Sequence, residues 1–330
     1  LSLGVLFNFI FNIKLIWCLL IASTFSTIYV WKGGLSSIIK TDYLQLILMF
    51  SGFFLLIGFS WHNSVSPLGL FKSLPATHQD PLGGNSLQYV LVWFFIAIWT
   101  IIDPNFFQRC TAVKNPEIAK KGLLISICFW FLFDVMTVTA GLYAYIHTVP
   151  ENPLMAYPLL GLEVLPPGFL GYFLVSLFAI IMSTIDSMSF VNAITIGRDI
   201  IWRLRKKDSK KNPVFLIKKG LIAVAILSIV LSILIPSVVK MLYTLGSLII
   251  PGLIIPFIHA LIGNNMRITK VNAILWLCVP VAISLLFFIM SALDIGKLLN
   301  IEPFYPGMAT SILIYFYLKI NSESKKLINH

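Results

Sequence analysis

Long apolar stretches separated by short polar connections run along almost the whole chain. A membrane-spanning helix needs about 20 predominantly apolar residues, and nine stretches approach or exceed that length. The first dozen residues are also apolar and resemble the end of an earlier segment. The pattern predicts an all-α polytopic membrane protein in which residues 1–330 form a single transmembrane domain. The nine stretches cover residues 13–31, 41–60, 88–106, 122–146, 167–193, 214–235, 238–262, 271–292 and 304–318.

Composition favours a membrane protein over a soluble one. Hydrophobic residues make up 58% of the 330 residues and charged residues only 11%, whereas soluble domains carry about 25% charged residues. The start of the chain lacks the basic region and the small-residue cleavage site of a signal peptide. The four cysteines have no metal-binding spacing, and the five histidines are dispersed. The sequence therefore does not favour an enzyme.

The distribution of basic residues predicts the orientation of the spans. Of the 24 lysines and arginines, all but Lys14, Lys72, Lys240 and Lys297 fall in alternate connections and in the C-terminal tail. Because basic connections stay in the cytoplasm, the C-terminus is predicted to be cytoplasmic in a multi-pass protein of the cell membrane. The net charge of +11 then reflects orientation and contact with anionic lipid rather than a nucleic-acid partner.

Four acidic residues lie in apolar stretches, where a carboxylate at the helix centre costs about 2.5–3.5 kcal/mol on insertion scales. They are Asp42, Asp103, Asp134 and Asp186. Asp42 follows Thr41 at the start of a stretch, so a helix-capping role is an alternative for it. Asp103 and Asp134 have long apolar flanks, which favours a solute or ion pathway over a hydrogen-bonded structural role.

Two stretches carry helix-breaking residues. Pro104 follows Asp103 inside residues 88–106 and removes a backbone donor there. Gly246, Ser247, Pro251 and Gly252 occur together inside residues 238–262, which predicts irregular backbone at this place as well. Interrupted spans are typical of transporter binding sites, although a simple proline kink is the alternative for each one.

One helical face of residues 167–193 offers oxygen ligands. Ile180, Ser183, Thr184 and Ser187 are spaced i, i+3, i+4 and i+7, so they share one face. Two hydroxyls and a loosened carbonyl one turn earlier are ligands that a weakly charged hard cation such as Na⁺ accepts. The alternative is that the hydroxyls bond back to the carbonyl one turn earlier.

Three stretches together resemble the sodium:solute symporter family. They are GGLSSIIKTDYLQ from Gly33, DPNFFQRCTAVKNPEIAKKG at 103–122 and MSTIDSMSFVNAITIGRDI at 182–200, and their order and sidedness also fit the family. The resemblance implies a LeuT-like inverted-repeat fold. It also implies that the nine stretches correspond to the fourth to twelfth helices, so that the first core helices are missing from this fragment.

The resemblance also implies site residues. In the family's second sodium site, the positions that match are the Ile180 carbonyl, Ser183 and Thr184, and Asp42 matches an aspartate on the sodium exit path. The positions that match the family's solute contacts are Trp99, Thr100, Asp103 and Tyr243. Asp134 is added because of its expected burial alone.

The expected function is Na⁺-coupled symport of a small polar solute by alternating access within the lipid bilayer. Sugar-transporting members have polar groups where this chain has Ile96 and Trp130, so a sugar is not favoured. Two alternatives stay open: a degenerate or non-transporting membrane fragment, and a proton-coupled symporter that uses the buried aspartates.

Overall fold

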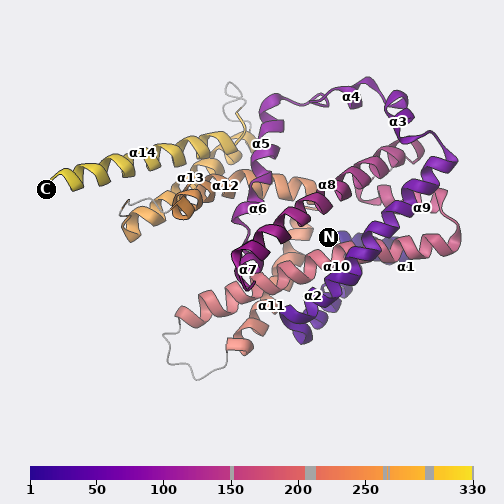
Figure 1. Cartoon of the computed structure of the whole chain (residues 1–330), viewed down its shortest axis with the longest axis horizontal. Coiled ribbons are helices and arrows are strands. Elements are labelled where there is room, and N and C mark those ends of the chain that lie inside the picture. Colours follow the sequence, from indigo (N-terminus) through magenta and orange to yellow (C-terminus); the bar gives the residue numbers. More distant parts are fainter. Residues whose placement is uncertain (149–151, 205–212, 263–265, 267, 294–300, 329–330) are drawn as a thin grey trace. The chain divides into compact units, whose positions relative to one another are not determined.

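The computed structural model describes residues 1–148, 152–204, 213–262, 266, 268–293 and 301–328 (Figure 1). Within these residues every regular element is a helix. The basic stretch at residues 205–212 and Lys297 lie outside the described residues. In chain order the elements are α1 (Ser2–Phe11), α2 (Leu15–Asn63), α3 (Pro67–Ser73), α4 (Ala76–Gln79), α5 (Leu87–Ala97), α6 (Trp99–Ile102), α7 (Pro104–Thr111), α8 (Pro116–His147), η1 (Pro153–Met155), α9 (Ala156–Val164), α10 (Pro167–Ile194), η2 (Thr195–Trp202), α11 (Pro213–Leu234), α12 (Val238–Ile262), α13 (Lys270–Ala292) and α14 (Phe304–Ile328).

Apolar helices long enough to cross a membrane dominate the chain. Seven stretches in the described residues meet this criterion, and an eighth is added if α1 and residues 15–31, which are bent by 118°, count as one broken span. The chain is therefore a polytopic membrane protein, while the predicted count of nine crossings is not confirmed. The predicted stretches at 13–31 and 41–60 belong to a single element, α2, which contains a kink at Gly34 with φ 64° and ψ 178°. Only glycine adopts that backbone conformation readily.

The two predicted interruptions have different outcomes. Residues 88–106 are broken as expected, because α5, α6 and α7 are separate helices and Asp103 between the last two has extended backbone. The prediction of irregular backbone near Pro251 was wrong, since α12 continues through Pro251 and Pro256 as one helix. A proline removes one helical hydrogen bond, and neighbouring helices can support the remainder.

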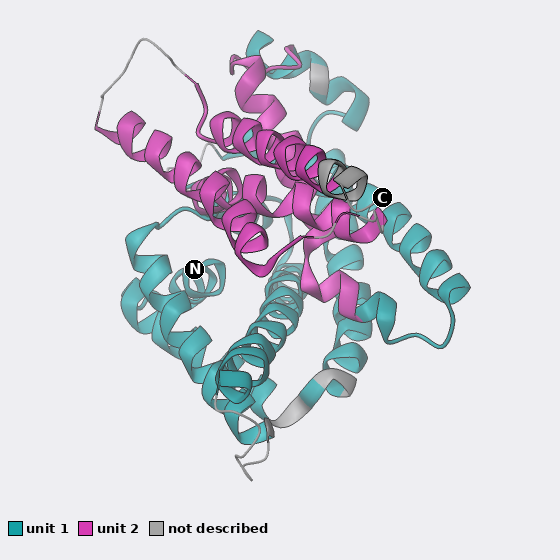
Figure 2. Cartoon of the chain, turned by 90° about the vertical axis from the view of Figure 1, so that its left-hand side faces the viewer, with its two compact units in different colours: residues 1–79, 109–238 teal, residues 80–108, 239–330 magenta. Residues whose placement is uncertain are grey.

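The chain divides into two compact units (Figure 2). Unit 1 comprises residues Leu1–Gln79 and Arg109–Val238, and unit 2 comprises Asp80–Gln108 and Val239–His330. In unit 1, α2 packs along α10, and α10 packs against α11. In unit 2, α13 packs along α14, and residues of α5, α12 and α14 share an apolar cluster.

Small residues and buried hydroxyls bring the helices of unit 1 together. Gly52 of α2 lies directly against Ser176 of α10, where a Cβ atom would clash. One residue earlier, the Ser51 hydroxyl is 2.6 Å from the Tyr172 hydroxyl. Because lipid is as apolar as leucine, close approach and hydrogen bonds of this kind drive helix association in a membrane more than apolar burial does.

The contact between η2 and α11 depends on a glycine. A Cβ atom at Gly197 would lie 2.5 Å from the Leu216 carbonyl oxygen and from the Ile217 nitrogen. We expect Gly197→Ala to lower the free energy of unfolding by about 1–3 kcal/mol, because backbone atoms cannot move aside cheaply. Thermal unfolding in detergent measures this effect. The control is Gly122→Ala on α8, where nothing lies within 4 Å, and equal melting temperatures for both variants would contradict the expectation.

Candidate functional site

The predicted oxygen face lies in the middle of α10, in unit 1. The Thr184 hydroxyl donates to the Ile180 carbonyl oxygen at 3.2 Å, which is the back-bonded arrangement that the sequence left as an alternative. This bond uses only the hydroxyl proton. The Thr184 oxygen keeps its lone pairs and can still accept a cation, whereas the Ile180 carbonyl also accepts the helical N–H one turn later and must release one of its two donors to bind an ion.

Ser183 joins this face to α2. Its hydroxyl donates to Asp42 Oδ1 at 2.9 Å, across 141 positions of sequence. Asp42 lies inside the part of α2 that follows the kink at Gly34, which continues to Asn63. The alternative reading of Asp42 as a helix N-cap was therefore wrong, because this helical segment has already begun before Asp42. The structure thus places Asp42 beside one of the predicted sodium ligands.

Arg109 completes a polar cluster that the sequence analysis missed. Its Nη2 atom donates to Asp42 Oδ2 at 3.3 Å and to the Ser187 hydroxyl at 2.7 Å. The Asp42 side chain is 22% exposed and that of Arg109 is 48% exposed. One guanidinium thus connects the end of α7 to α2 and α10. The sequence analysis treated Arg109 only as a cytoplasmic charge and so missed its contacts with α2 and α10. Its position near the end of a span was the feature that could have indicated them.

Asp186 adds a second carboxylate to the same region. Its side chain is fully buried, and neither carboxylate oxygen has a hydrogen-bond partner among the described residues. Asp42 is close enough for the two carboxylates to repel each other. A buried charge without a partner is costly, so Asp186 is charged only when a cation lies beside it and is otherwise protonated. The neutral oxygens of Ile180, Ser183 and Thr184 fit the ligand chemistry of Na⁺.

A small cavity with several hydroxyl groups in its lining lies on the Thr184 side of α10. Its volume is about 260 Å³, and α1, α2, α10 and α11 form its walls. Hydroxyl groups from three of these helices line it together with Thr184, which gives a hydrated ion several possible partners. They include Ser23, Ser26, Thr27, Ser189, Ser228 and Ser232.

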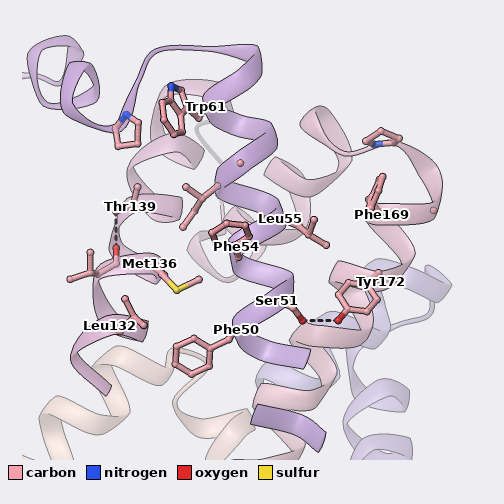
Figure 3. Close-up of a pocket in the computed structure, with 16 residues that line it drawn as sticks. Phe50, Ser51, Phe54, Leu55, Trp61, Leu132, Met136, Thr139, Phe169 and Tyr172 are labelled. Atoms are coloured by element: carbon pink, nitrogen blue, oxygen red, sulfur yellow. Dashed lines mark hydrogen bonds between the residues drawn. The ribbon is translucent and has the colours of Figure 1, made fainter. Parts of the chain in front are cut away.

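A second, larger pocket has the opposite character. It encloses about 1420 Å³ between α2, α8 and α10 (Figure 3). Aromatic and aliphatic side chains such as Phe54, Met136 and Phe169 line it. Its polar groups are few, and among them Ser51 meets Tyr172 and Thr139 donates to the Val135 carbonyl oxygen at 2.7 Å. This pocket suits neither an ion nor a strongly polar solute.

The predicted solute residues lie mostly in unit 2, around the break in residues 88–106. Trp99 and Thr100 belong to the one-turn helix α6 and are partly buried. Asp103 is 5% exposed, and its Oδ1 atom accepts bonds from the Asn105 backbone nitrogen at 2.7 Å and from Asn105 Nδ2 at 3.0 Å. The Asp103 carboxylate therefore stabilises the start of α7 through a local turn.

Tyr243 and Trp99 pack against the same apolar cluster of unit 2. The Tyr243 hydroxyl donates to Glu302 Oε2 at 2.7 Å. Glu302 is a residue that the sequence analysis did not single out, because it lies outside the apolar stretches. Asp134 belongs to unit 1 and is exposed on α8. The expectation that Asp134 is buried was wrong, since nearly the whole apolar surface of α8 is bare within this chain.

Comparison with known proteins adds a family to this geometry. A family model described as "Sodium:solute symporter family" matches residues 1–274. The chain is 24% identical over 260 residues to sodium/glucose cotransporter 1 of Ovis aries, a match that covers 63% of this chain and 38% of that protein. It is 26% identical over 238 residues to the high-affinity proline transporter PutP of Bacillus subtilis, covering 69% of this chain and 50% of that protein.

The name of a third relative contains a different solute, choline. High-affinity choline transporter 1 of Drosophila melanogaster is 27% identical over 237 residues, which cover 66% of this chain and 38% of that protein. The chain thus spans between 38% and 50% of the length of these curated relatives. All three names describe transporters rather than enzymes.

Proposed function

Since the chain belongs to the sodium:solute symporter family, we propose that it forms part of a Na⁺-coupled symporter that moves a small polar solute by alternating access. We assign it a LeuT-like inverted-repeat core. The observation that carries the proposal is the oxygen cluster on α10, where the Ile180 carbonyl and the hydroxyls of Ser183 and Thr184 lie next to Asp42 and Arg109.

Sodium is the cargo that these groups would bind. An ion that leaves water must recover its hydration energy from protein oxygens, and neutral oxygens hold it without trapping it. The carboxylates of Asp42 and Asp186 add negative charge beside them, which favours a cation over an anion. In this proposal Asp42 lies on the path by which Na⁺ leaves toward the cytoplasm.

The energy for uptake comes from the Na⁺ gradient. Each Na⁺ that moves through 100 mV contributes about 2.3 kcal/mol, which sustains roughly a fifty-fold solute gradient. The proposed solute contacts are Trp99, Thr100, Asp103 and Tyr243. The names of the three relatives suggest proline, choline and glucose as the first solutes to test.

Uptake into proteoliposomes that contain the full-length gene product tests the proposal. Labelled solutes from this panel are offered with an inward Na⁺ gradient, or with K⁺ in place of Na⁺. We expect accumulation of at least one solute with Na⁺ and only background uptake with K⁺. Equal uptake in both media would contradict Na⁺ coupling and would favour proton coupling. The absence of any uptake and of any Na⁺-dependent thermal stabilisation would favour a non-transporting protein.

We also propose that the C-terminus and the connection after α7 face the cytoplasm of the cell. Single cysteines at Ala112 and Asn85, both exposed, test this orientation in a variant whose four native cysteines are replaced. An impermeant thiol reagent added to intact cells should label Asn85→Cys and leave Ala112→Cys unlabelled until the membrane is opened. The reverse pattern would contradict the orientation.

A further inference from the structure

An aromatic cluster with one carboxylate lies in unit 2. The ring centroid of Tyr243 is 4.8 Å from that of Tyr89 and 5.3 Å from that of Trp93, and the latter two are 6.5 Å apart. All three rings are partly exposed. We call these three residues, with Tyr305 and Glu302, the aromatic–acidic cluster.

The helices of unit 2 hold this cluster in place. Tyr89 and Trp93 are four residues apart on α5, so they share one helical face. Below them Val92 and Ile96 pack with residues of α12 and α14 in one buried apolar cluster. The Tyr305 hydroxyl donates to the Gln88 carbonyl oxygen at 2.7 Å. The first turns of α5, α12 and α14 are therefore fixed beside one another, and the rings do not depend on a loop for their position.

Glu302 gives the cluster its charge. One of its carboxylate oxygens accepts the Tyr243 hydroxyl at 2.7 Å. Within the part of the chain that the structure describes, no lysine, arginine or histidine lies within ion-pair distance of Glu302. The start of α14 offers it a weaker electrostatic partner. The carboxylate is therefore held beside Tyr243 without a cationic partner among the described residues.

This combination has a specific chemical preference. The face of an aromatic ring attracts a cation, most strongly one that is weakly hydrated, and quaternary ammonium groups are recognised in this way. A metal ion would instead require several oxygen ligands, and Glu302 is the one carboxylate in this cluster among the residues that the structure describes. A sugar would donate hydrogen bonds from its hydroxyl groups to Glu302 but would leave the charge of the carboxylate uncompensated.

We propose that the aromatic–acidic cluster binds the ammonium group of an organic cation, with the rings of Tyr89, Trp93 and Tyr243 against its methyl or methylene groups and Glu302 as its counter-ion. The inference rests on the proposed transport function in one respect, because it makes an organic ammonium compound the solute class. Binding itself requires neither transport nor Na⁺, so the two can be tested separately.

Choline and its uncharged carbon isostere 3,3-dimethyl-1-butanol are the probes, because they have nearly the same shape and differ in charge. Affinities are measured by titration calorimetry on the full-length gene product in a maltoside detergent, which contains no choline headgroup. We expect saturable choline binding, and binding of the isostere weaker by about tenfold or more. Equal affinities for the two probes would overturn the proposal.

Substitutions in the aromatic–acidic cluster test whether choline binds there. Glu302→Gln keeps an acceptor for the Tyr243 hydroxyl and removes only the charge, so it should weaken choline binding by about tenfold and leave the isostere unchanged. Trp93→Leu should weaken choline binding to a similar degree. The matched control is Phe94→Leu, on the adjacent position of α5 with 66% exposure. Circular dichroism and gel filtration identify any variant that fails to fold, and Tyr243→Phe then provides a milder second test, with an expected loss of about threefold.

The outcomes separate this inference from the proposed function. Choline binding that depends on Glu302, in a protein without Na⁺-dependent uptake, would support the cluster and contradict the symporter. Na⁺-dependent uptake of another solute, without choline binding or competition by choline, would support the symporter and overturn the cluster. Choline binding that is unaltered in both Glu302→Gln and Trp93→Leu would place the cation elsewhere and also overturn the inference.

Discussion

Replacing both Ser183 and Thr184 with alanine is expected to raise the Na⁺ concentration for half-maximal uptake by about tenfold or more. The double variant removes two of the three neutral oxygens on the α10 face, and alanine fits a helix well. The α10 side chains before this face are mostly apolar, and the Ser187 hydroxyl already accepts a bond from Arg109, so neither replaces these ligands. Because the Thr184 hydroxyl bonds to a carbonyl of its own helix, its loss should leave the helix intact.

Initial uptake rates measured across a range of Na⁺ concentrations, in the full-length gene product, test this expectation. Ser176→Ala is the matched control, because the Ser176 hydroxyl bonds back to the Phe173 carbonyl oxygen at 2.7 Å on the same helix. Its Na⁺ dependence should equal that of the wild type. A double variant with wild-type Na⁺ dependence would remove Ser183 and Thr184 from the sodium site and would leave the aspartates as the candidates for coupling.

The sequence predicted the helices of the membrane domain well, because apolar length is a property of each segment alone. The predicted stretch at 167–193 corresponds to α10, Pro167–Ile194, almost residue for residue. The stretch at 122–146 was too short at its start, since α8 begins at Pro116. Lys120 and Lys121 ended the apolar run there, but a helix continues beyond the apolar region when its polar residues reach water.

Breaks and joins between segments were harder to predict. The stretches at 13–31 and 41–60 meet at a kink at Gly34 within α2 rather than across a loop, and Pro251 leaves α12 continuous. Proline and glycine mark places where a helix can bend, while packing against neighbouring helices determines whether it breaks. At Pro104 the break does occur, and the Asp103 carboxylate stabilises the new helix start that follows it.

In the candidate site too, groups close together in sequence could be predicted to lie together, whereas contacts between distant residues could not. The shared face of Ile180, Ser183 and Thr184 follows from helical spacing, and the structure brings these groups together. The contact of Ser183 with Asp42 spans 141 positions and that of Arg109 with Asp42 spans 67, so helical periodicity could not reveal either of them. Glu302 pairs with Tyr243 across 59 positions, and it too has no signal in the local sequence.

The Asp42–Arg109 contact is expected to act as one unit in the transport cycle. Arg109 connects α7 with α2 and α10, and alternating access requires such a contact to break and re-form as the helices move. Asp42→Asn keeps an oxygen that accepts the Ser183 hydroxyl and removes only the charge. We expect it to lower the maximal uptake rate by about tenfold, and we expect Arg109→Gln to have a similar effect.

A double variant tests whether Asp42 and Arg109 act together in the transport cycle or independently of each other. If the pair acts as a unit, the double variant Asp42→Asn with Arg109→Gln should be no slower than the worse single variant. The matched control is the more exposed pair of Asp199 and Arg203, 3.9 Å apart on successive turns. Its neutral variants should stay within about twofold of the wild type, because exposed pairs contribute little. Uptake rates normalised to surface expression provide the measurement. If the losses from Asp42→Asn and Arg109→Gln multiply in the double variant, the two residues act separately and the contact has no role of its own.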